Sequence, residues 1–181
     1  IRIEQINFKD STLTAESTCT LRLQEISSDK TTFSLSLASL TVDSVGCDSR
    51  IHYLGHSGEN LTFGCDAGIP ASDILTIRIR YHGHPAIDPG GWGGFYFRNG
   101  IAFNMGAGFT VEPHAFGRAW FPANDVFNDK ATFNFEVTTS INEKAFCNGT
   151  LYNYEQLTEG RIRWYWRETV PITTYLATVT A

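Results

Sequence analysis

The chain has 181 residues, of which 42% are hydrophobic and 18% are charged, and its formal net charge is −5 at pH 7. This composition supports a well-buried core and excludes an intrinsically disordered chain. A net negative chain lacks the basic face that nucleic-acid phosphates require, so nucleic acid is excluded as a partner. No apolar run reaches the roughly 20 residues needed to cross a bilayer, so we expect no membrane segment. The sequence does not indicate a cellular location.

Alternation of apolar and polar residues runs through the chain and predicts β-strands. The apolar positions of the clearest runs are Phe33, Leu35 and Leu37; Leu75, Ile77, Ile79 and Tyr81; Phe133, Phe135 and Val137; Ile162, Trp164 and Trp166; and Tyr175, Ala177 and Val179. Turn signals between them include Ser27-Ser28-Asp29, Asp88-Pro89-Gly90-Gly91 and Asn148-Gly149, of which the last predicts a hairpin. No stretch has helical spacing. We therefore predict one all-β domain over residues 1–181, an antiparallel β-sandwich or related double sheet.

The four cysteines are widely spaced along the chain and contain no C-x-x-C pair. They are Cys19, Cys47, Cys65 and Cys147. Because structural zinc sites use closely spaced cysteine pairs, we expect no such site here. We expect all four to be free thiols, and a Cys47–Cys65 disulfide is the alternative.

Two pairs of histidines are the next candidates for metal binding. His52 and His56 have the outer spacing of H-E-x-x-H, the helical zinc-protease motif. On a strand, however, residues four apart are separated by about 13 Å, too far for two ligands of one metal. His82 and His84 lie at a strand end before Pro85, which cannot continue the hydrogen-bonded ladder, and no third ligand has supporting spacing. We therefore expect no metal site in this chain.

The glycine-rich stretch from Gly90 to Phe97 also lacks a recognisable chemistry. It has no Gly-Lys-Ser/Thr ending, so it predicts unusual φ angles or close backbone packing rather than a phosphate loop. No serine lies in a G-x-S-x-G motif. Trp164 and Trp166 occupy the apolar phase of their strand, which favours the core over a sugar-binding platform. The residues alone therefore contain no catalytic centre.

Several segments, in order along nearly the whole chain, match the patterns of one protein family. Thr41–Val45 is similar to T-V-x-S-V, Ile77–Gly83 to I-x-I-x-Y-x-G with Gly94-Phe95-Tyr96 after it, Asn148–Leu151 to S-N-G-x-L, and Pro171–Ala177 to P-M-x-T-Y-L-x. These patterns belong to the N-terminal domain of the aminopeptidase N and leukotriene hydrolase family of zinc metallopeptidases, which the chain therefore resembles.

The most distinctive segment is GRAWFPANDVFNDKATF, residues 117–133. It resembles the family pattern A-R-R-x-F-P-C-x-D-E-P-x-x-K-A-x-F. The matching residues are Arg118, Phe121, Pro122, Asp125, Lys130, Ala131 and Phe133, whereas Ala119, Ala123 and Val126-Phe127 depart from the pattern. We expect this segment to be a scaffold whose polar residues hold a loop in place, rather than a catalytic site.

The resemblance also indicates candidate substrate-binding residues just upstream. Thr110-Val111-Glu112 lies near the position of the family's T-Q-x-E, whose acidic residue helps to bind the free amino group of the substrate. Glu112 would match the acid and Thr110 would replace the Gln, although one extra residue separates Glu112 from Phe121. A carboxylate can bind an ammonium group through a charge-assisted hydrogen bond. The alternative is that Glu112 is a solvated loop residue before a proline.

The resemblance implies a saddle-like, double-sheet N-terminal domain. The family's zinc ligands, catalytic glutamate and G-x-M-E-N segment belong to the next domain, which would follow residue 181. The full-length parent would be a zinc aminopeptidase that removes N-terminal residues from peptides. This chain would pack on its own catalytic domain and contact the peptide substrate, but it would bind no zinc and have no catalytic residues or activity alone. The alternative is a stand-alone β-sandwich module that binds carbohydrate or protein.

Overall fold

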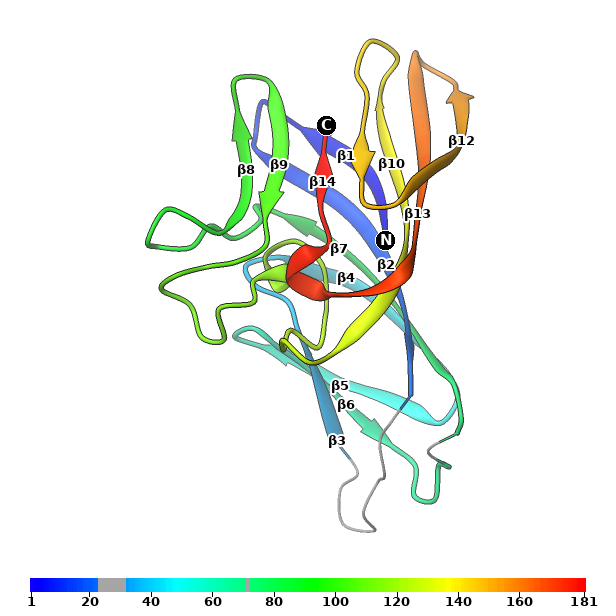
Figure 1. Ribbon diagram of the computed structural model, residues 1–181. Helices are drawn as coiled ribbons and strands as arrows, with labels where there is room; N and C mark the ends of the chain where they lie inside the picture. Colours follow the sequence, from blue (N-terminus) through cyan, green and yellow to red (C-terminus); the bar gives the residue numbers. More distant parts are fainter. Residues whose placement is uncertain (23–31, 71) are drawn as a thin grey trace.

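The computed structural model describes residues 1–22, 32–70 and 72–181 (Figure 1). Its strands are β1 (Arg2–Asn7), β2 (Thr12–Leu21), β3 (Thr32–Ser36), β4 (Thr41–Cys47), β5 (Ile51–Ser57), β6 (Asn60–Cys65), β7 (Leu75–Gly83), β8 (Gly94–Arg98), β9 (Ile101–Met105), β10 (Lys130–Ser140), β11 (Phe146–Cys147), β12 (Thr150–Leu157), β13 (Arg161–Thr173) and β14 (Val179–Thr180). Two single turns of 3-10 helix, η1 (Gly117–Ala119) and η2 (Thr174–Leu176), interrupt them. No helix among these residues has the length and hydrophobicity to span a membrane. The turn predicted at Ser27-Ser28-Asp29 lies outside the described residues.

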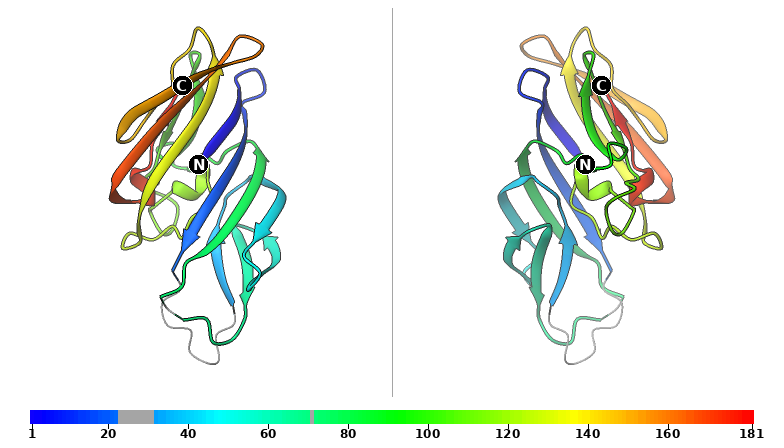
Figure 2. Two further views of the ribbon diagram at one scale, coloured as in Figure 1. Left: turned by 90° about the vertical axis from the view of Figure 1, so that its right-hand side faces the viewer. Right: turned by 90° about the vertical axis from the view of Figure 1, so that its left-hand side faces the viewer.

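The strands form three sheets, which confirms the predicted all-β fold. A seven-stranded sheet has the order β12-β13-β10-β1-β2-β7-β4, a four-stranded sheet the order β11-β14-β9-β8, and a three-stranded sheet the order β3-β6-β5. The long strands of the large sheet extend along the molecule, with β3, β5 and β6 toward one end and β8, β9 and β14 toward the other (Figures 1 and 2). Strand pairs are antiparallel except for β1 with β10, which are parallel. One core cluster contains residues from all three sheets.

Strand β7 shows why these sequences form half-buried strands. Leu75, Ile77, Ile79 and Tyr81 are fully buried, whereas the residues between them are exposed. This period of two matches the strand pleat and fixes the register, because a slip of one residue would turn the apolar face to water. The Tyr81 hydroxyl is hydrogen-bonded to that of Ser17 on β2 at 3.0 Å. This buried hydroxyl therefore has a hydrogen-bond partner, as buried polar groups normally do.

The other predicted runs are also strands, with one exception. The run at Tyr175, Ala177 and Val179 is only partly a strand, because η2 replaces its first residues and β14 begins at Val179. Tertiary contacts explain the difference. Thr174 hydrogen-bonds the buried carboxylate of Asp125, and Asn104 bonds both the carbonyl of Ala177 and the amide of Val179. Such contacts override a local alternation pattern.

The predicted hairpin at Asn148-Gly149 is wrong, although a turn is present. β11 pairs with β14 and β12 pairs with β13, so the turn carries the chain from one sheet to another. The Asn148 side-chain oxygen accepts hydrogen bonds from the backbone amide and the hydroxyl of Thr178. Gly149 has a φ of +84°, and a Cβ there would overlap the carbonyl of Arg167. Asn148-Gly149 therefore forms the connection between two sheets rather than a hairpin within one sheet.

All four cysteines are free, as predicted, and Cys47 and Cys65 lie on β4 and β6. Burial raises the pKa of the Cys19 thiol to about 11 and that of Cys147 to about 12. Thiols with raised pKa values carry little of the reactive thiolate at neutral pH. Trp164 and Trp166 are partly buried and pack against the core, as expected.

The close approach at Gly149 can be tested by Gly149→Ala. Alanine would have to adopt the positive φ of this position, which is strained for a residue with a Cβ, and its methyl group would overlap the carbonyl of Arg167. We therefore expect the free energy of unfolding to fall by about 2 kcal/mol or more. Urea denaturation followed by tryptophan fluorescence measures this. Gly46→Ala is the matched control, because open space surrounds that position in β4 and its φ is not positive. Equal stabilities of the two variants would contradict the close approach of Gly149 to Arg167.

Candidate functional site

The two predicted substrate-binding residues lie in the loop between β9 and η1, residues 106–116. Glu112 has 81% of its side chain exposed, and its carboxylate lies 3.3 Å from the ring of His114. The peptide bond between Glu112 and Pro113 is cis. The Glu112 carboxylate thus faces solvent on the surface of this chain, where a ligand can approach it.

Thr110 has a different environment from Glu112, because its hydroxyl is used within the protein. It donates a hydrogen bond to the carboxylate of Asp88 and accepts one from the backbone amide of Gly90 at 3.0 Å. Asp88 and Gly90 belong to the neighbouring loop between β7 and β8, residues 84–93. Thr110 therefore links the two loops. Both hydrogen bonds given for its hydroxyl are made to the neighbouring loop.

Asp88 is the centre of this contact between loops. Its side chain is buried and accepts hydrogen bonds from the backbone amides of Phe109 and Thr110 as well as from the Thr110 hydroxyl. These donors, the Thr110 hydroxyl first, lower the pKa of Asp88 below its ordinary value of 3.8. A lowered carboxyl pKa means that the ionised form is favoured by folding, so this contribution is present above pH 3.8 and is lost as the pH falls through the lower folded value.

Arg118 holds the other side of the loop that carries Glu112. Its guanidinium group donates hydrogen bonds to the backbone carbonyls of Glu112 at 3.4 Å, Pro113 at 3.3 Å and Ala115. The planar guanidinium has five N–H donors in a fixed arrangement, so it can hold several carbonyls of one loop at once. The backbone from Glu112 to Ala115 is thereby fixed.

Arg118 itself is buried and forms an ion pair with Asp125 at 3.0 Å; the two side chains are 4% and 2% exposed. A second carboxylate, that of Glu59, accepts from Arg118 at 2.8 Å. Asp125 also accepts from the backbone amides of Gly117 and Arg118 and from the hydroxyl of Thr174. The polar residues of segment 117–133 thus hold loops in place, which is the scaffold role predicted for them.

The histidines that the sequence singled out each have a partner of their own. His52 lies 2.9 Å from Asp66 and His82 lies 2.7 Å from Asp43, whereas His56 and His84 contact backbone carbonyls. His52 and His56 both lie on strand β5, and β7 ends at Gly83 before His84. In the parts of the chain that the structure describes, no three His, Cys, Asp or Glu residues are grouped so as to hold a metal ion.

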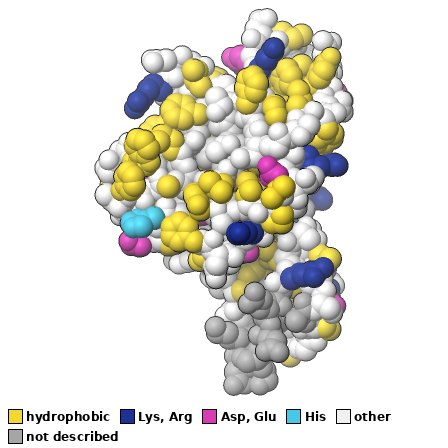
Figure 3. All heavy atoms as spheres, viewed as in Figure 1, with side chains coloured by type: hydrophobic (Ala, Val, Ile, Leu, Met, Phe, Trp, Pro, Cys, Tyr) yellow, Lys and Arg dark blue, Asp and Glu magenta, His cyan; other side chains and the backbone are white. Residues whose placement is uncertain are grey.

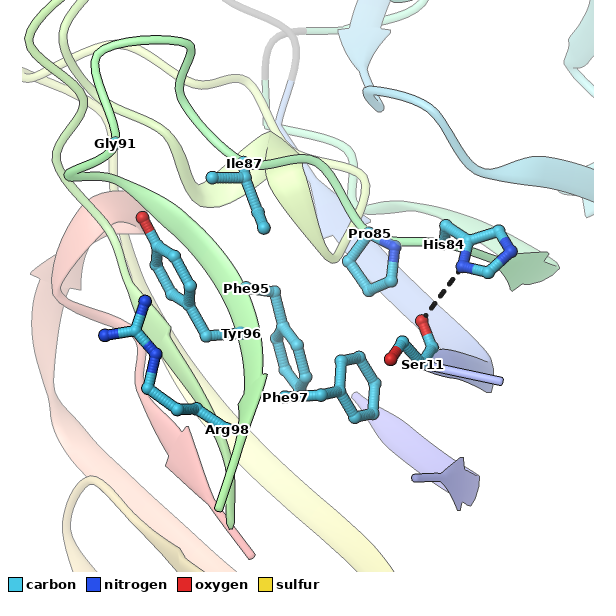
Figure 4. Close-up of a pocket in the computed structure, with 9 residues that line it drawn as sticks. All are labelled: Ser11, His84, Pro85, Ile87, Gly91, Phe95, Tyr96, Phe97 and Arg98. Carbon is cyan, nitrogen blue, oxygen red and sulfur yellow. Dashed lines mark hydrogen bonds between the residues drawn. The ribbon is translucent and has the colours of Figure 1, made fainter. Parts of the chain in front are cut away.

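A shallow hollow of about 490 Å³ lies beside strand β8 (Figure 4). Its lining residues are Ser11, His84, Pro85, Ile87, Gly91, Phe95, Tyr96, Phe97 and Arg98. Arg98 lies over the ring of Tyr96, 5.8 Å from its centroid. The lining includes no carboxylate, so this hollow does not offer an anion to a substrate amino group. The candidate site therefore remains at the 106–116 loop.

Sequence reasoning missed Asp88 and the aromatic residues beside it. Trp92 and Phe109, from the two loops, are stacked with their ring centroids 5.7 Å apart. The only sequence signal for Asp88 was its place as the first residue of a predicted turn. That turn does form, and the amide of Gly91 donates a hydrogen bond to the carbonyl of Asp88 at 2.7 Å. The hydrogen bonds that tether Asp88 to the 106–116 loop are long-range contacts, which a local sequence pattern does not show.

The tether can be tested with Asp88→Ala. The amides of Phe109 and Thr110 lose their acceptor, so we expect faster hydrogen–deuterium exchange throughout residues 106–116. Mass spectrometry of peptides from this loop measures the change. Asp10→Ala, which removes an exposed carboxylate from another turn, is the control and should leave the loop's exchange unchanged. An unchanged exchange rate in Asp88→Ala would show that Asp88 does not order the loop.

The buried ion pair can be tested with Arg118→Met. This variant leaves the Asp125 carboxylate buried without its cation, so we expect the free energy of unfolding to fall by about 3–5 kcal/mol. Arg80→Met is the control, because Arg80 is 51% exposed and pairs with Glu4 at 3.1 Å, and exposed pairs contribute about 0–1 kcal/mol. Urea denaturation of both variants measures the difference. A cost for Arg118→Met no greater than that for Arg80→Met would contradict the central role of this pair.

Solved structures with a similar fold are zinc metallopeptidases and an aminopeptidase. An M1 zinc metallopeptidase mutant from Deinococcus radiodurans, bound to a Tyr-ser-ala substrate, matches with a TM-score of 0.82 and 21% identity over 99% of this chain and 40% of its own. A two-domain M1 zinc metallopeptidase mutant bound to L-tryptophan matches with a TM-score of 0.83 and 19% identity over the same shares. Legionella pneumophila aminopeptidase A, in complex with aspartic acid, matches with a TM-score of 0.76 and 17% identity over 99% of this chain and 20% of its own. At these identities the likeness shows the fold.

The chain therefore spans about 40% of the length of the first two of these proteins. No curated protein sequence matches it. The sequence profile of the peptidase M1 N-terminal domain matches residues 4–176, which is nearly the whole chain. Together with the all-β fold, this match shows that the chain belongs to the peptidase M1 N-terminal domain family.

Proposed function

We propose that this chain is the amino-terminal part of a zinc aminopeptidase and that Glu112 binds the free amino group of the peptide substrate. The catalytic domain, with its zinc, is another part of the same protein. The activity of the whole protein is the removal of N-terminal residues from peptides. The family to which the chain belongs supports the coarse assignment, and the Tyr-ser-ala substrate of one structural relative supports a peptide as the ligand class.

The observation that carries the role of Glu112 is an exposed carboxylate on a fixed backbone. Arg118 holds the carbonyls of residues 112, 113 and 115, and Asp88 holds the amides of residues 109 and 110. Because the backbone is already ordered, binding of a cation by Glu112 has to order only this side chain and not the loop, which favours affinity. The substrate ammonium would make a charge-assisted hydrogen bond to Glu112.

The zinc chemistry is assigned to the catalytic domain because the described residues offer no set of donors for the metal. His52, His82 and His114 each lie beside a single carboxylate, that of Asp66, Asp43 and Glu112 respectively. A catalytic zinc needs three protein ligands that converge on one point and an open position for water. The part of this chain that binds substrate therefore orients the amino terminus, and bond cleavage occurs elsewhere in the protein.

A group of exposed apolar residues supports contact with a further domain. Phe127 is 50% exposed and packs edge-on against Tyr175 at 5.6 Å, and Leu176 is 45% exposed. Figure 3 shows hydrophobic side chains spread over this face of the molecule, where η2 lies in Figure 1. Burying apolar surface of this kind contributes about 25 cal/mol per Å². We assign this face to the contact with the catalytic domain.

Glu112→Gln in the full-length gene product tests the proposal. The amide keeps the size of the side chain but removes its charge, so we expect kcat/KM for peptides with a free amino terminus to fall about 10- to 100-fold. This range corresponds to the roughly 1.5–3 kcal/mol of a hydrogen bond to a charged group. Steady-state hydrolysis of an alanyl and a phenylalanyl peptide measures it.

Glu159→Gln is the matched control, because the Glu159 side chain is 80% exposed and lies in the turn between β12 and β13. We expect its kcat/KM to equal that of the unmodified protein. Full activity of Glu112→Gln on both peptides would refute the assigned role of Glu112. A gene product without peptidase activity would refute the assignment of the whole protein.

A further inference from the structure

Two large aromatic side chains form an exposed pair next to the loop that carries Glu112. Trp92 is 50% exposed and Phe109 is 67% exposed, and their rings are nearly parallel, at 22° and 5.7 Å between centroids. Trp92 comes from the loop between β7 and β8, and Phe109 from the loop between β9 and η1. This pair is a preformed apolar surface, because the part of each ring that remains exposed can be buried against a ligand.

The backbone beneath both rings is fixed. The hydroxyl of Tyr96 donates hydrogen bonds to the carbonyls of Trp92 at 2.8 Å and Gly93 at 3.0 Å. The amide of Phe109 is held by Asp88 at 2.9 Å. Gly93 lies so close to the backbone of Ala107 that no Cβ fits between them. A ligand that binds the pair therefore does not have to order these loops first.

The aromatic pair lies within reach of the same ligand as Glu112. Phe109 is three positions before Glu112 in the chain, so their α-carbons are at most about 11 Å apart. An N-terminal amino acid carries its ammonium group and its side chain on one carbon. A single substrate residue can therefore direct the ammonium group to Glu112 and its side chain to the rings. Figure 3 shows hydrophobic side chains at the left of the view, next to a histidine and an acidic side chain.

Charge in the two loops favours an apolar side chain over an acidic one. Loops 84–93 and 106–116 contain Asp88, Glu112, His84 and His114 but no lysine or arginine. Asp88 is buried and its carboxylate is occupied by backbone and hydroxyl donors. An acidic first residue would bring a second negative charge next to Glu112, and Arg118, the arginine that contacts this loop, is buried and already paired with Asp125 and Glu59.

We propose that Trp92 and Phe109 form the surface that receives the side chain of the substrate's first residue, so that peptides beginning with an aromatic or large aliphatic residue are preferred. This inference rests on the proposed role of Glu112. Apolar and aromatic side chains would stack on or pack against the exposed rings, whereas alanine would reach them poorly and aspartate would be repelled by Glu112.

The test compares hydrolysis of Phe-, Leu-, Ala- and Asp-initiated dipeptides by the full-length protein and by Trp92→Ala, Phe109→Ala and the double variant. We expect the ratio of kcat/KM for the Phe peptide to that for the Ala peptide to fall about 10-fold or more in the double variant. Trp92→Phe, which keeps a ring, should recover part of the ratio. Tyr154→Ala is the control, because Tyr154 is an aromatic residue that is 60% exposed but lies on strand β12, where it packs on Trp164. The ratio of kcat/KM for the Phe and Ala peptides should not change in this variant.

The outcomes separate this inference from the proposal on which it rests. Glu112→Gln should lower kcat/KM for all four peptides by similar factors, whereas the aromatic variants should change their ranking. If Glu112→Gln acts as expected but the double variant lowers all four equally, the aromatic pair contacts the catalytic domain and the inference is wrong. An unchanged ranking with unchanged rates also overturns it. Inhibition constants of free L-phenylalanine and L-alanine give the same comparison for any variant whose hydrolysis is too slow to measure.

Discussion

The buried pair of Arg118 and Asp125 is the constraint on which the arrangement of the loops depends. A charge removed from water must be paired and hydrogen-bonded, and both members of this pair are almost completely buried. Each partner uses its remaining hydrogen-bonding capacity on a different segment. Arg118 binds the carbonyls of residues 112, 113 and 115, and Asp125 binds backbone amides of η1 and the hydroxyl of Thr174 in η2. One charge pair therefore fixes the loop of Glu112 relative to both 3-10 turns.

The sequence predicted the elements whose structure is set by local pattern. The alternation in Leu75–Tyr81 predicted a strand because one face of that strand is fully buried. The sequence of residues 117–133 predicted a scaffold because its polar residues matched a family pattern in register. By contrast, Asn148-Gly149 predicted a hairpin, and only the pairing of its two flanking strands with other partners shows that it is a crossing between sheets. Local turn chemistry determines that the chain turns, and long-range pairing determines where it goes.

The candidate site was predictable only in part for the same reason. Glu112 and Thr110 could be named from a short motif, but their environments could not. The structure places the Thr110 hydroxyl in a tether to Asp88 and leaves the Glu112 side chain exposed. Asp88, Trp92 and Phe109 come together because two separate loops pack against each other, and a buried carboxylate that binds backbone amides has no characteristic spacing in sequence. The functional role of Glu112 stays a prediction.

The position of β1 has a consequence for how the protein is made. β1 lies in the middle of the seven-stranded sheet, and its parallel neighbour β10 contributes Glu136 opposite Arg2. During synthesis, the first two strands leave the ribosome more than a hundred residues before that neighbour, so the edge of β1 that β10 later covers has no partner over that stretch of translation. Contacts between distant residues form slowly, and unpaired strand edges promote association with other chains. The large sheet can therefore close only after β10 has emerged, and until then that edge of β1 is open to pairing with another strand.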